Sequence, residues 1–226
     1  MNLLFTDRIS DSTYIEMISH GYSLSNGTLT RPAESCWHLI IVRHNRTVTP
    51  LMVGPLRTSG VATFAAGAEF LWIKFKLGVF MPNLPFKGIL DRETPLPTTG
   101  SQSFWLQGCA WPLPNADTTE DFVQRLVREE VLLRDPLVNA VINREPQQLS
   151  PRTMRERFLR STGLSQVHIR QHMRANQAAT LLAQGSAVLD VVEQLGYFDQ
   201  SHLIHSLKRF VGRTPNQIVG PLCQSS

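Results

Sequence analysis

Two patterns of hydrophobic and polar positions divide the chain. Up to about residue 112, short apolar runs are separated by Gly and Pro. In the run 68–77 the alternating positions Leu71, Ile73, Phe75 and Leu77 share one face, which predicts a half-buried strand. From about residue 118 onward, apolar residues recur every three or four positions, which predicts helices. The sequence therefore predicts an α+β chain, with an N-terminal β-rich barrel or sandwich followed by an all-α domain.

The predicted elements suggest where the chain is divided. A β-rich domain is expected over residues 1–112, with strands within 13–24, 36–45, 47–56, 60–67 and 68–77. The prolines of 111–117 indicate a linker and 118–135 predicts an amphipathic helix, so that 113–135 form a linker and connecting helix. Asp135-Pro136 opens the next helix, with Pro at its first position. Residues 136–226 are expected to form the helical domain. In it, Ser150 is expected to cap a helix whose buried stripe is Met154, Phe158 and Leu159.

The most informative stretch is 189–215, LDVVEQLGYFDQSHLIHSLKRFVGRTP. Gly196 can end a helix, and the Asp199 carboxylate can cap the next one, which is expected from Gln200 to about Phe210. The buried stripe of that second helix is expected to be Leu203, Leu207 and Phe210. Two short helices joined by a tight turn form a helix-turn-helix, whose second helix presents polar side chains to base edges in the major groove.

The same stretch resembles the second DNA-binding motif of the AraC/XylS family of transcription regulators. The positions that fit the family pattern are Gly196, Tyr197, Asp199, Ser201, His202, Leu203, Leu207, Lys208, Gly212, Thr214 and Pro215. Upstream, 149–165 resembles the recognition helix of the family's first motif. The fitting positions there are Leu149, Ser150, Arg152, Thr153, Met154, Arg157, Phe158, Gly163, Leu164 and Ser165. Residues 174–185 resemble the long helix that joins the two motifs, and the β-rich domain resembles, more loosely, the cupin-like effector domain of these regulators.

The resemblance implies a cytoplasmic, sequence-specific DNA-binding transcription regulator that is controlled by a small-molecule effector. Its two recognition helices would begin at Ser150 and Gln200 and enter successive major grooves of double-stranded DNA. The candidate DNA-binding residues are Arg152, Thr153, Arg155, Glu156, Arg160, Gln200, Ser201, Ile204, His205, Lys208 and Arg213. Trp37 and Trp72 are candidates for lining an effector pocket, because aromatic side chains often line such cavities. RNA polymerase and a second copy of the chain are further candidate partners.

Charge and cysteine content agree with this interpretation. The net charge is +4, and from residue 136 onward ten Lys and Arg stand against five Asp and Glu, so the basic surplus lies in the helical domain and favours a polyanionic partner. We expect no membrane span and no secretory signal. Cys36, Cys109 and Cys223 lie far apart, which favours a reducing compartment over a disulfide framework. A fragment from about Thr118 to Ser226 carries both motifs and is expected to bind DNA.

The sequence departs from the family pattern in three places. Few residues separate Asp135-Pro136 from the Ser150 cap. Either 118–134 and 136–143 are the first two helices of the first motif, or that motif is abbreviated and only loosely docked. Glu156 stands where the family usually has an arginine, and it either accepts a hydrogen bond from a base or pairs with Arg152 or Arg160 along the helix. His205 likewise replaces the usual arginine of the second recognition helix.

Two other function classes are open to this sequence. The first is a cupin-type small-molecule enzyme with a regulatory helical domain, but no catalytic residues, cofactor site or cupin set of metal ligands is predicted. His168 and His172 are four residues apart on a predicted helix, yet packed or exposed histidines are more common at such a spacing than a metal pair. The second alternative is an interaction module that has lost DNA binding.

Overall fold

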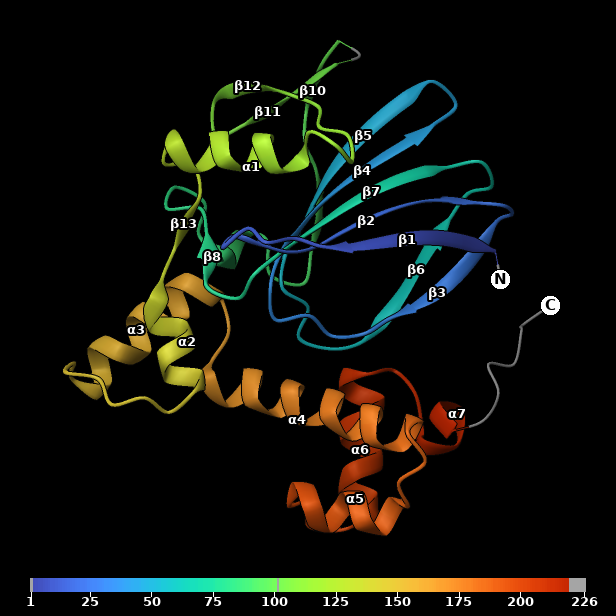
Figure 1. Ribbon diagram of the computed structural model, residues 1–226, viewed down its shortest axis with the longest axis vertical. Helices are drawn as coiled ribbons and strands as arrows, with labels where there is room; N and C mark the ends of the chain where they lie inside the picture. Colours follow the sequence, from blue (N-terminus) through green and yellow to red (C-terminus); the bar gives the residue numbers. More distant parts are fainter. Residues whose placement is uncertain (1, 101, 220–226) are drawn as a thin grey trace.

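A β-rich half is followed by a helical half in the computed structural model, which describes residues 2–100 and 102–219 (Figure 1). Cys223, used above in the argument from cysteines, lies outside the described residues. The strands are β1 (Leu3–Ile9), β2 (Ile15–Ser23), β3 (Gly27–Arg31), β4 (His38–His44), β5 (Thr47–Val53), β6 (Gly60–Phe64), β7 (Glu69–Phe75), β8 (Val79–Phe80), β9 (Glu93–Pro95), β10 (Thr98–Thr99), β11 (Ser103–Leu106), β12 (Cys109–Pro112) and β13 (Leu133–Arg134). A single 3-10 turn, η1 (Phe86–Gly88), lies between β8 and β9.

The largest sheet is antiparallel and has six strands in the order β1-β2-β7-β4-β5-β9. The two-stranded antiparallel ribbon β3-β6 is separate from this sheet in the pairing and lies beside it in Figure 1. All five strand regions expected from the sequence are present as β2, β4, β5, β6 and β7. The strands that sequence reasoning missed are β1, β3 and the short ones, whose residues show no clear alternation.

Alternation along the central strands gives the sheet two apolar faces. Leu39 and Ile41 of β4, with Leu71 and Ile73 of β7, are at most 2% exposed and pack into the main core. Their neighbours on the other face, such as Ile40 and Trp72, line a small cavity between the sheet and the β3-β6 ribbon. The main core is closed by β11, β12 and a helix, so the β-rich half has a packed side and a hollow side.

That helix, α1 (Thr119–Arg128), belongs to the β-rich half. Phe122 and Leu126 are buried in the core of the large sheet. The helix predicted over 118–135 was too long: the chain leaves it at Glu129, Glu130 has a left-handed φ of 54°, and β13 pairs with β8. Leu132 is 0% exposed in the same core, which this change of direction makes possible. The domain boundary expected between residues 135 and 136 stays a proposal.

The helical half contains six helices among the described residues: α2 (Pro136–Ile142), α3 (Pro151–Thr162), α4 (Gln166–Ala183), α5 (Val188–Leu195), α6 (Gln200–Phe210) and α7 (Pro215–Val219). The N-terminal end of α4 packs with α2 and α3, and its C-terminal end packs with α5 and α6. The 18 residues of α4 make a rod about 27 Å long, which separates the two helix-turn-helix regions. No helix in the described ranges is both long and apolar enough to cross a bilayer.

Candidate nucleic-acid interface

The second helix-turn-helix is complete. α5 ends at Gly196, which has a left-handed φ of 66°, and α6 begins after Asp199. The Asp199 carboxylate accepts the backbone N–H of His202 at 2.7 Å, so it caps the helix as predicted. The buried stripe is also as predicted, with every member at most 2% exposed: Leu203, Leu207 and Phe210.

The predicted base-reading side of α6 is free. Gln200, Ser201 and His205 are exposed, and Ile204 is partly buried. Lys208 is exposed on the last turns of α6, and Arg213 is exposed just beyond it. The N-terminal residues of a recognition helix are the ones that reach base edges. The geometry therefore permits the predicted contacts, whose role in DNA binding remains a proposal.

The first helix-turn-helix region has two helices, α2 and α3, where one interpretation of the sequence expected three. Among the described residues, the element before α3 in the helical half is the seven-residue α2, which packs on α3 and α4. The interpretation that 118–134 supplies the first helix of this motif is wrong, because α1 is buried against the large sheet. Of the other alternative, the structure supports the abbreviation but not the loose docking, because Phe158 of α3 is buried with residues of α2 and α4.

The shortened motif leaves part of α3 uncovered. Met154, Phe158 and Leu159 were expected to be the buried stripe, but only Phe158 is buried, while Leu159 is 49% exposed. Together with Val167, these side chains line a groove of about 370 Å³. Within the described ranges no helix lies over this groove, which explains why a stripe with helical spacing was mistaken for core.

An ion pair holds α3 against the start of α2. Asp135, 5% exposed, accepts from Arg157 Nε at 2.7 Å and from Arg157 Nη2 at 2.8 Å. The same carboxylate accepts from Ser161 Oγ at 2.9 Å and from the backbone N–H of Leu137 at 3.0 Å. Burial would raise the pKa of Asp135, but these hydrogen bonds outweigh it and hold the pKa below its usual value. Asp135 is thus both the helix cap predicted from the sequence and the anchor of α3.

The candidate DNA-binding residues of α3 are exposed, but three of them have side-chain partners on the same helix or its cap. The exposed set is Arg152, Thr153, Arg155, Glu156 and Arg160. Glu156 accepts from Arg152 Nε at 2.9 Å, and the Thr153 hydroxyl lies 2.8 Å from the hydroxyl of the Ser150 cap. Of the two interpretations of Glu156, the pairing along the helix is the one present in this structure.

The other end of α6 is docked on the β-rich half. Its last carbonyl groups, which a helix leaves without internal partners, accept hydrogen bonds from that half. The Ala33 N–H donates to Phe210 O at 2.6 Å, the Ser59 N–H donates to Arg209 O at 2.7 Å, and Ser59 Oγ donates to Lys208 O at 2.8 Å. The β-rich half therefore caps the recognition helix at the end opposite to its base-reading residues. No sequence pattern indicated Ala33 or Ser59, because this contact is purely tertiary.

His172 joins α4 to the loop 32–37, which also contains Ala33. It is 5% exposed, its Nδ1 lies 2.7 Å from Ser35 Oγ, and its Nε2 lies 3.0 Å from Asn176 Nδ2. Burial, together with the nearby charge of Lys74 and the neighbouring His168, lowers the pKa of His172 to about 4. Both ring nitrogens have protein partners, so this histidine is a packed one. His168 lies edge-on to the ring of Phe210, with centroids 5.3 Å apart.

The two candidate effector tryptophans have different surroundings. Trp37 is 2% exposed, stacks on Phe75 with centroids 4.0 Å apart, and donates its indole N–H to Val79 O at 3.0 Å. Trp72 lines the cavity between the sheet and the β3-β6 ribbon, whose volume is about 110 Å³. Arg31 and Glu93, which form an ion pair, also line it. We keep Trp72 in the effector proposal and assign Trp37 to packing.

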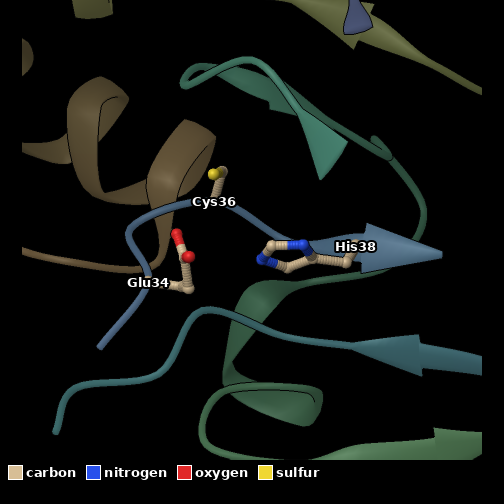
Figure 2. Close-up of side chains that lie close together, drawn as sticks. All are labelled: Glu34, Cys36 and His38. Atoms are coloured by element: carbon tan, nitrogen blue, oxygen red, sulfur yellow. The ribbon is translucent and has the colours of Figure 1, made fainter. Parts of the chain in front are cut away.

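Sequence reasoning missed one polar cluster in the β-rich half. Glu34, Cys36 and His38 converge at the entrance to β4 (Figure 2). Burial raises the pKa of Cys36 and of Glu34, and it lowers the pKa of His38 to about 3. The signal that could have found this cluster is the close spacing of three metal-ligand residue types, Glu34, Cys36 and His38, just before a predicted strand.

A protein-family model matches the region that holds both motifs. Residues 147–219 match the model of a helix-turn-helix domain family. No curated protein matches the chain. Among solved structures, the crystal structure of a point variant of apo ToxT from Vibrio cholerae strain SCE256 aligns with a TM-score of 0.39 and 9% identity, over 94% of this chain and 98% of that chain. The family match points to a DNA-binding regulator rather than to an enzyme. Residues 147–219 are therefore similar to a helix-turn-helix domain, in the region where the motif positions predicted DNA-binding motifs.

Proposed function

We propose that the chain is a sequence-specific transcription regulator that reads DNA mainly with α6. The observation that carries this proposal is the complete second helix-turn-helix, whose α6 is capped at both ends while its N-terminal residues stay exposed. The basic surplus of the helical half supports a polyanionic partner. The first helix-turn-helix region, abbreviated to α2 and α3, contributes contacts to the DNA backbone from exposed arginines such as Arg152 and Arg155 rather than a second full set of base contacts.

The β-rich half is the sensing part in this proposal. A cavity of about 110 Å³ is small beside the roughly 300–1,000 Å³ of typical ligand pockets, so its effector is a small apolar molecule, or the ribbon opens to admit a larger one. Filling the cavity by Ala62→Phe should abolish the response to such an effector and leave DNA binding intact. RNA polymerase, a second copy of the chain and a cytoplasmic location remain predictions.

The test of DNA recognition uses the full chain. Binding-site selection from random duplexes should yield a preferred sequence. On that sequence, Gln200→Ala should weaken binding by about 1–3 kcal/mol, because Gln pairs with adenine through two hydrogen bonds, and it should have little effect on random DNA. Gln124→Ala, an identical change at an exposed position of α1, is the control and should change neither.

A second pair of variants tests contact with the DNA backbone. Arg213→Ala should weaken binding to all sequences about equally and reduce the slope of log affinity against log salt by about 0.9. Arg128→Ala removes the same charge from an exposed position on α1 and should leave the slope unchanged. Binding of neither selected nor random duplex at low salt, with the full chain shown to be folded by circular dichroism, would contradict the regulator proposal and favour an interaction module.

A further inference from the structure

Three ligand-bearing side chains converge where the loop 32–37 leads into β4. Glu34, Cys36 and His38 place a carboxylate oxygen, a thiol sulfur and a ring nitrogen within 4.8 Å of one another (Figure 2). Cys36 is 7% exposed and His38 is 1% exposed. A fourth candidate ligand atom is close, because Glu16 Oε2 lies 4.0 Å from Cys36 Sγ. The segment 34–38 and β2 thus supply sulfur, nitrogen and oxygen to the same point.

The His38 ring carries a second, independent observation. Its Nδ1 accepts the indole N–H of Trp72 at 2.5 Å. Its Nε2 is buried and has no hydrogen-bond partner in the part of the chain that the structure describes. The ring projects toward Glu34 and Cys36 (Figure 2). Buried polar atoms are nearly always paired, so an unpaired nitrogen that faces two other ligand groups indicates that something binds between them.

We propose that this cluster binds a thiophilic divalent cation, for which Zn²⁺ is the best fit. Zn²⁺ takes Cys, His and carboxylate ligands in tetrahedral geometry, whereas Mg²⁺ and Ca²⁺ require oxygen ligands. Zinc bond lengths of 2.0–2.3 Å place tetrahedral ligand atoms roughly 3.3–3.6 Å apart. The side chains must therefore approach one another by about 1 Å, which changes of side-chain rotamer can provide.

Lys74 is the competitor of the metal ion. Its Nζ lies 3.2 Å from Glu34 Oε2 and 3.2 Å from Glu16 Oε1, so it neutralises the carboxylates that the metal would use. The Lys74 side chain is 19% exposed, and its flexible stem lets the ammonium group move toward water. Removal of this ammonium should therefore raise the affinity for the metal.

Metal binding also requires Trp72 to move. A metal-bound imidazole keeps its remaining proton on the other ring nitrogen and donates it to an acceptor. The indole N–H of Trp72 can only donate, so it must turn away from His38 Nδ1 when Nε2 binds the metal. Trp72 lines the apolar cavity and is partly exposed, which gives it room to turn. A change in tryptophan fluorescence should accompany metal binding.

The position of the cluster connects it to the docked helices. Ala33 and Ser35 of the same loop hold α6 and α4, through Phe210 O and His172. Contraction of the cluster around a metal ion would shift this loop and so the docking of α6. We therefore expect Zn²⁺ to change the affinity for DNA. This effect on DNA affinity rests on the proposed function, whereas metal binding does not.

The test titrates the full, metal-stripped chain with Co²⁺, and then displaces the Co²⁺ with Zn²⁺. We expect one equivalent to bind, with a thiolate-to-cobalt charge-transfer absorption in the near ultraviolet. A Cys109→Ser/Cys223→Ser double variant, which removes the two other thiols, should keep this absorption. Cys36→Ser should abolish it and reduce affinity by at least the roughly 100-fold that loss of an outer-shell partner can cause. An absorption that survives in Cys36→Ser, or tight Co²⁺ binding without one, would overturn the proposal.

A second variant, Lys74→Met, tests the proposal independently if Cys36→Ser does not fold. Lys74→Met removes the competing cation and should increase affinity for Zn²⁺, with a larger change in Trp fluorescence at equal metal. Unchanged or weaker binding in a folded Lys74→Met chain would also overturn the proposal. Absence of DNA binding together with a normal cobalt absorption would contradict the proposed function and leave the metal site standing.

Discussion

Replacement of Gly163 by alanine tests whether α3 is docked on the β-rich half. Gly163 follows α3 and has a left-handed φ of 73°. A Cβ built on it would lie 2.6 Å from Phe86 Cβ and 2.9 Å from Phe86 Cγ, and Phe86 is 7% exposed in the main core. Because Phe86 Cβ is fixed to the backbone, no change of rotamer removes this clash. The chain must separate α3 from η1 or distort one of them.

Gly67 provides a matched control. It has the same φ of 73°, and nothing lies within 4 Å of the Cβ it lacks. Gly67→Ala therefore carries only the backbone cost of a left-handed L-residue, about 1–2 kcal/mol. Gly163→Ala carries this cost and a further 1–3 kcal/mol, roughly, for overpacking against Phe86.

Thermal unfolding of the full chain measures the difference. For a protein of this size, 1 kcal/mol corresponds to roughly 2–4 °C in Tm. We expect Gly67→Ala to lower Tm by about 2–8 °C and Gly163→Ala to lower it by roughly 2–12 °C more. If the helical half undocks before the core unfolds, a second transition appears at lower temperature, which also supports the contact. Equal shifts with a single transition in both variants would refute the docking of α3 on Phe86.

Three further predictions concern charged and titratable groups. Asp135→Ala should destabilise the chain by about 2–4 kcal/mol in urea unfolding at pH 7, because it removes charge-assisted hydrogen bonds. The folded pKa of Asp135 is lowered, so this stabilisation exists above the unfolded pKa of about 3.9 and is lost as pH falls through the folded pKa. The difference in stability between the two proteins should therefore shrink in strong acid, and a difference that persists there would contradict the ion pair. His172 has a folded pKa of about 4 against about 6.5 in the unfolded chain, so its contribution to stability should be full above pH 6.5 and fall by roughly 3 kcal/mol as pH drops to 4. His172→Gln should flatten this part of the pH profile of urea unfolding. An unchanged profile in that variant would show that His172 is protonated in the folded chain. Glu156→Gln should tighten binding to random duplex, because it removes a negative charge that is paired with Arg152 on the candidate interface. Glu129→Gln, which removes the same kind of i,i+4 partner at the end of α1, should not change binding. Equal effects of the two variants in a filter-binding titration would show that Glu156 faces away from DNA.

The sequence predicted the parts of the fold whose information is local. The helix-turn-helix from α5 to α6 was located to the residue, since Gly196, Asp199 and the buried stripe each act within one or two turns of helix. The alternating strands of the large sheet were found for the same reason. The end of α1 was missed, because Leu132 is buried in the core by tertiary contacts, and such contacts leave no periodic pattern in the sequence.

The candidate site was predictable only in part. The exposed polar positions of α6 follow from the amphipathic pattern of one helix. Leu159 was assigned to the core because helical spacing shows which face is apolar, but not whether a partner helix covers that face. The docking of α6 through Ala33 and Ser59 depends on backbone groups, which any residue carries, so no residue pattern could indicate it.

This docking changes what counts as the functional unit of the chain. The sequence favoured a fragment from about Thr118 to Ser226 as sufficient for DNA binding. In the structure such a fragment would carry α1 without its core, and it would expose three carbonyl groups of α6 that the β-rich half now satisfies. It would also remove Leu77 and Leu90, which pack against the small core of α2, α3 and α4. Since the first helix-turn-helix region is abbreviated to α2 and α3, part of its support comes from the β-rich half. A change in that half, from an effector in the cavity or a metal ion at the loop 32–37, therefore has direct physical routes to both recognition helices.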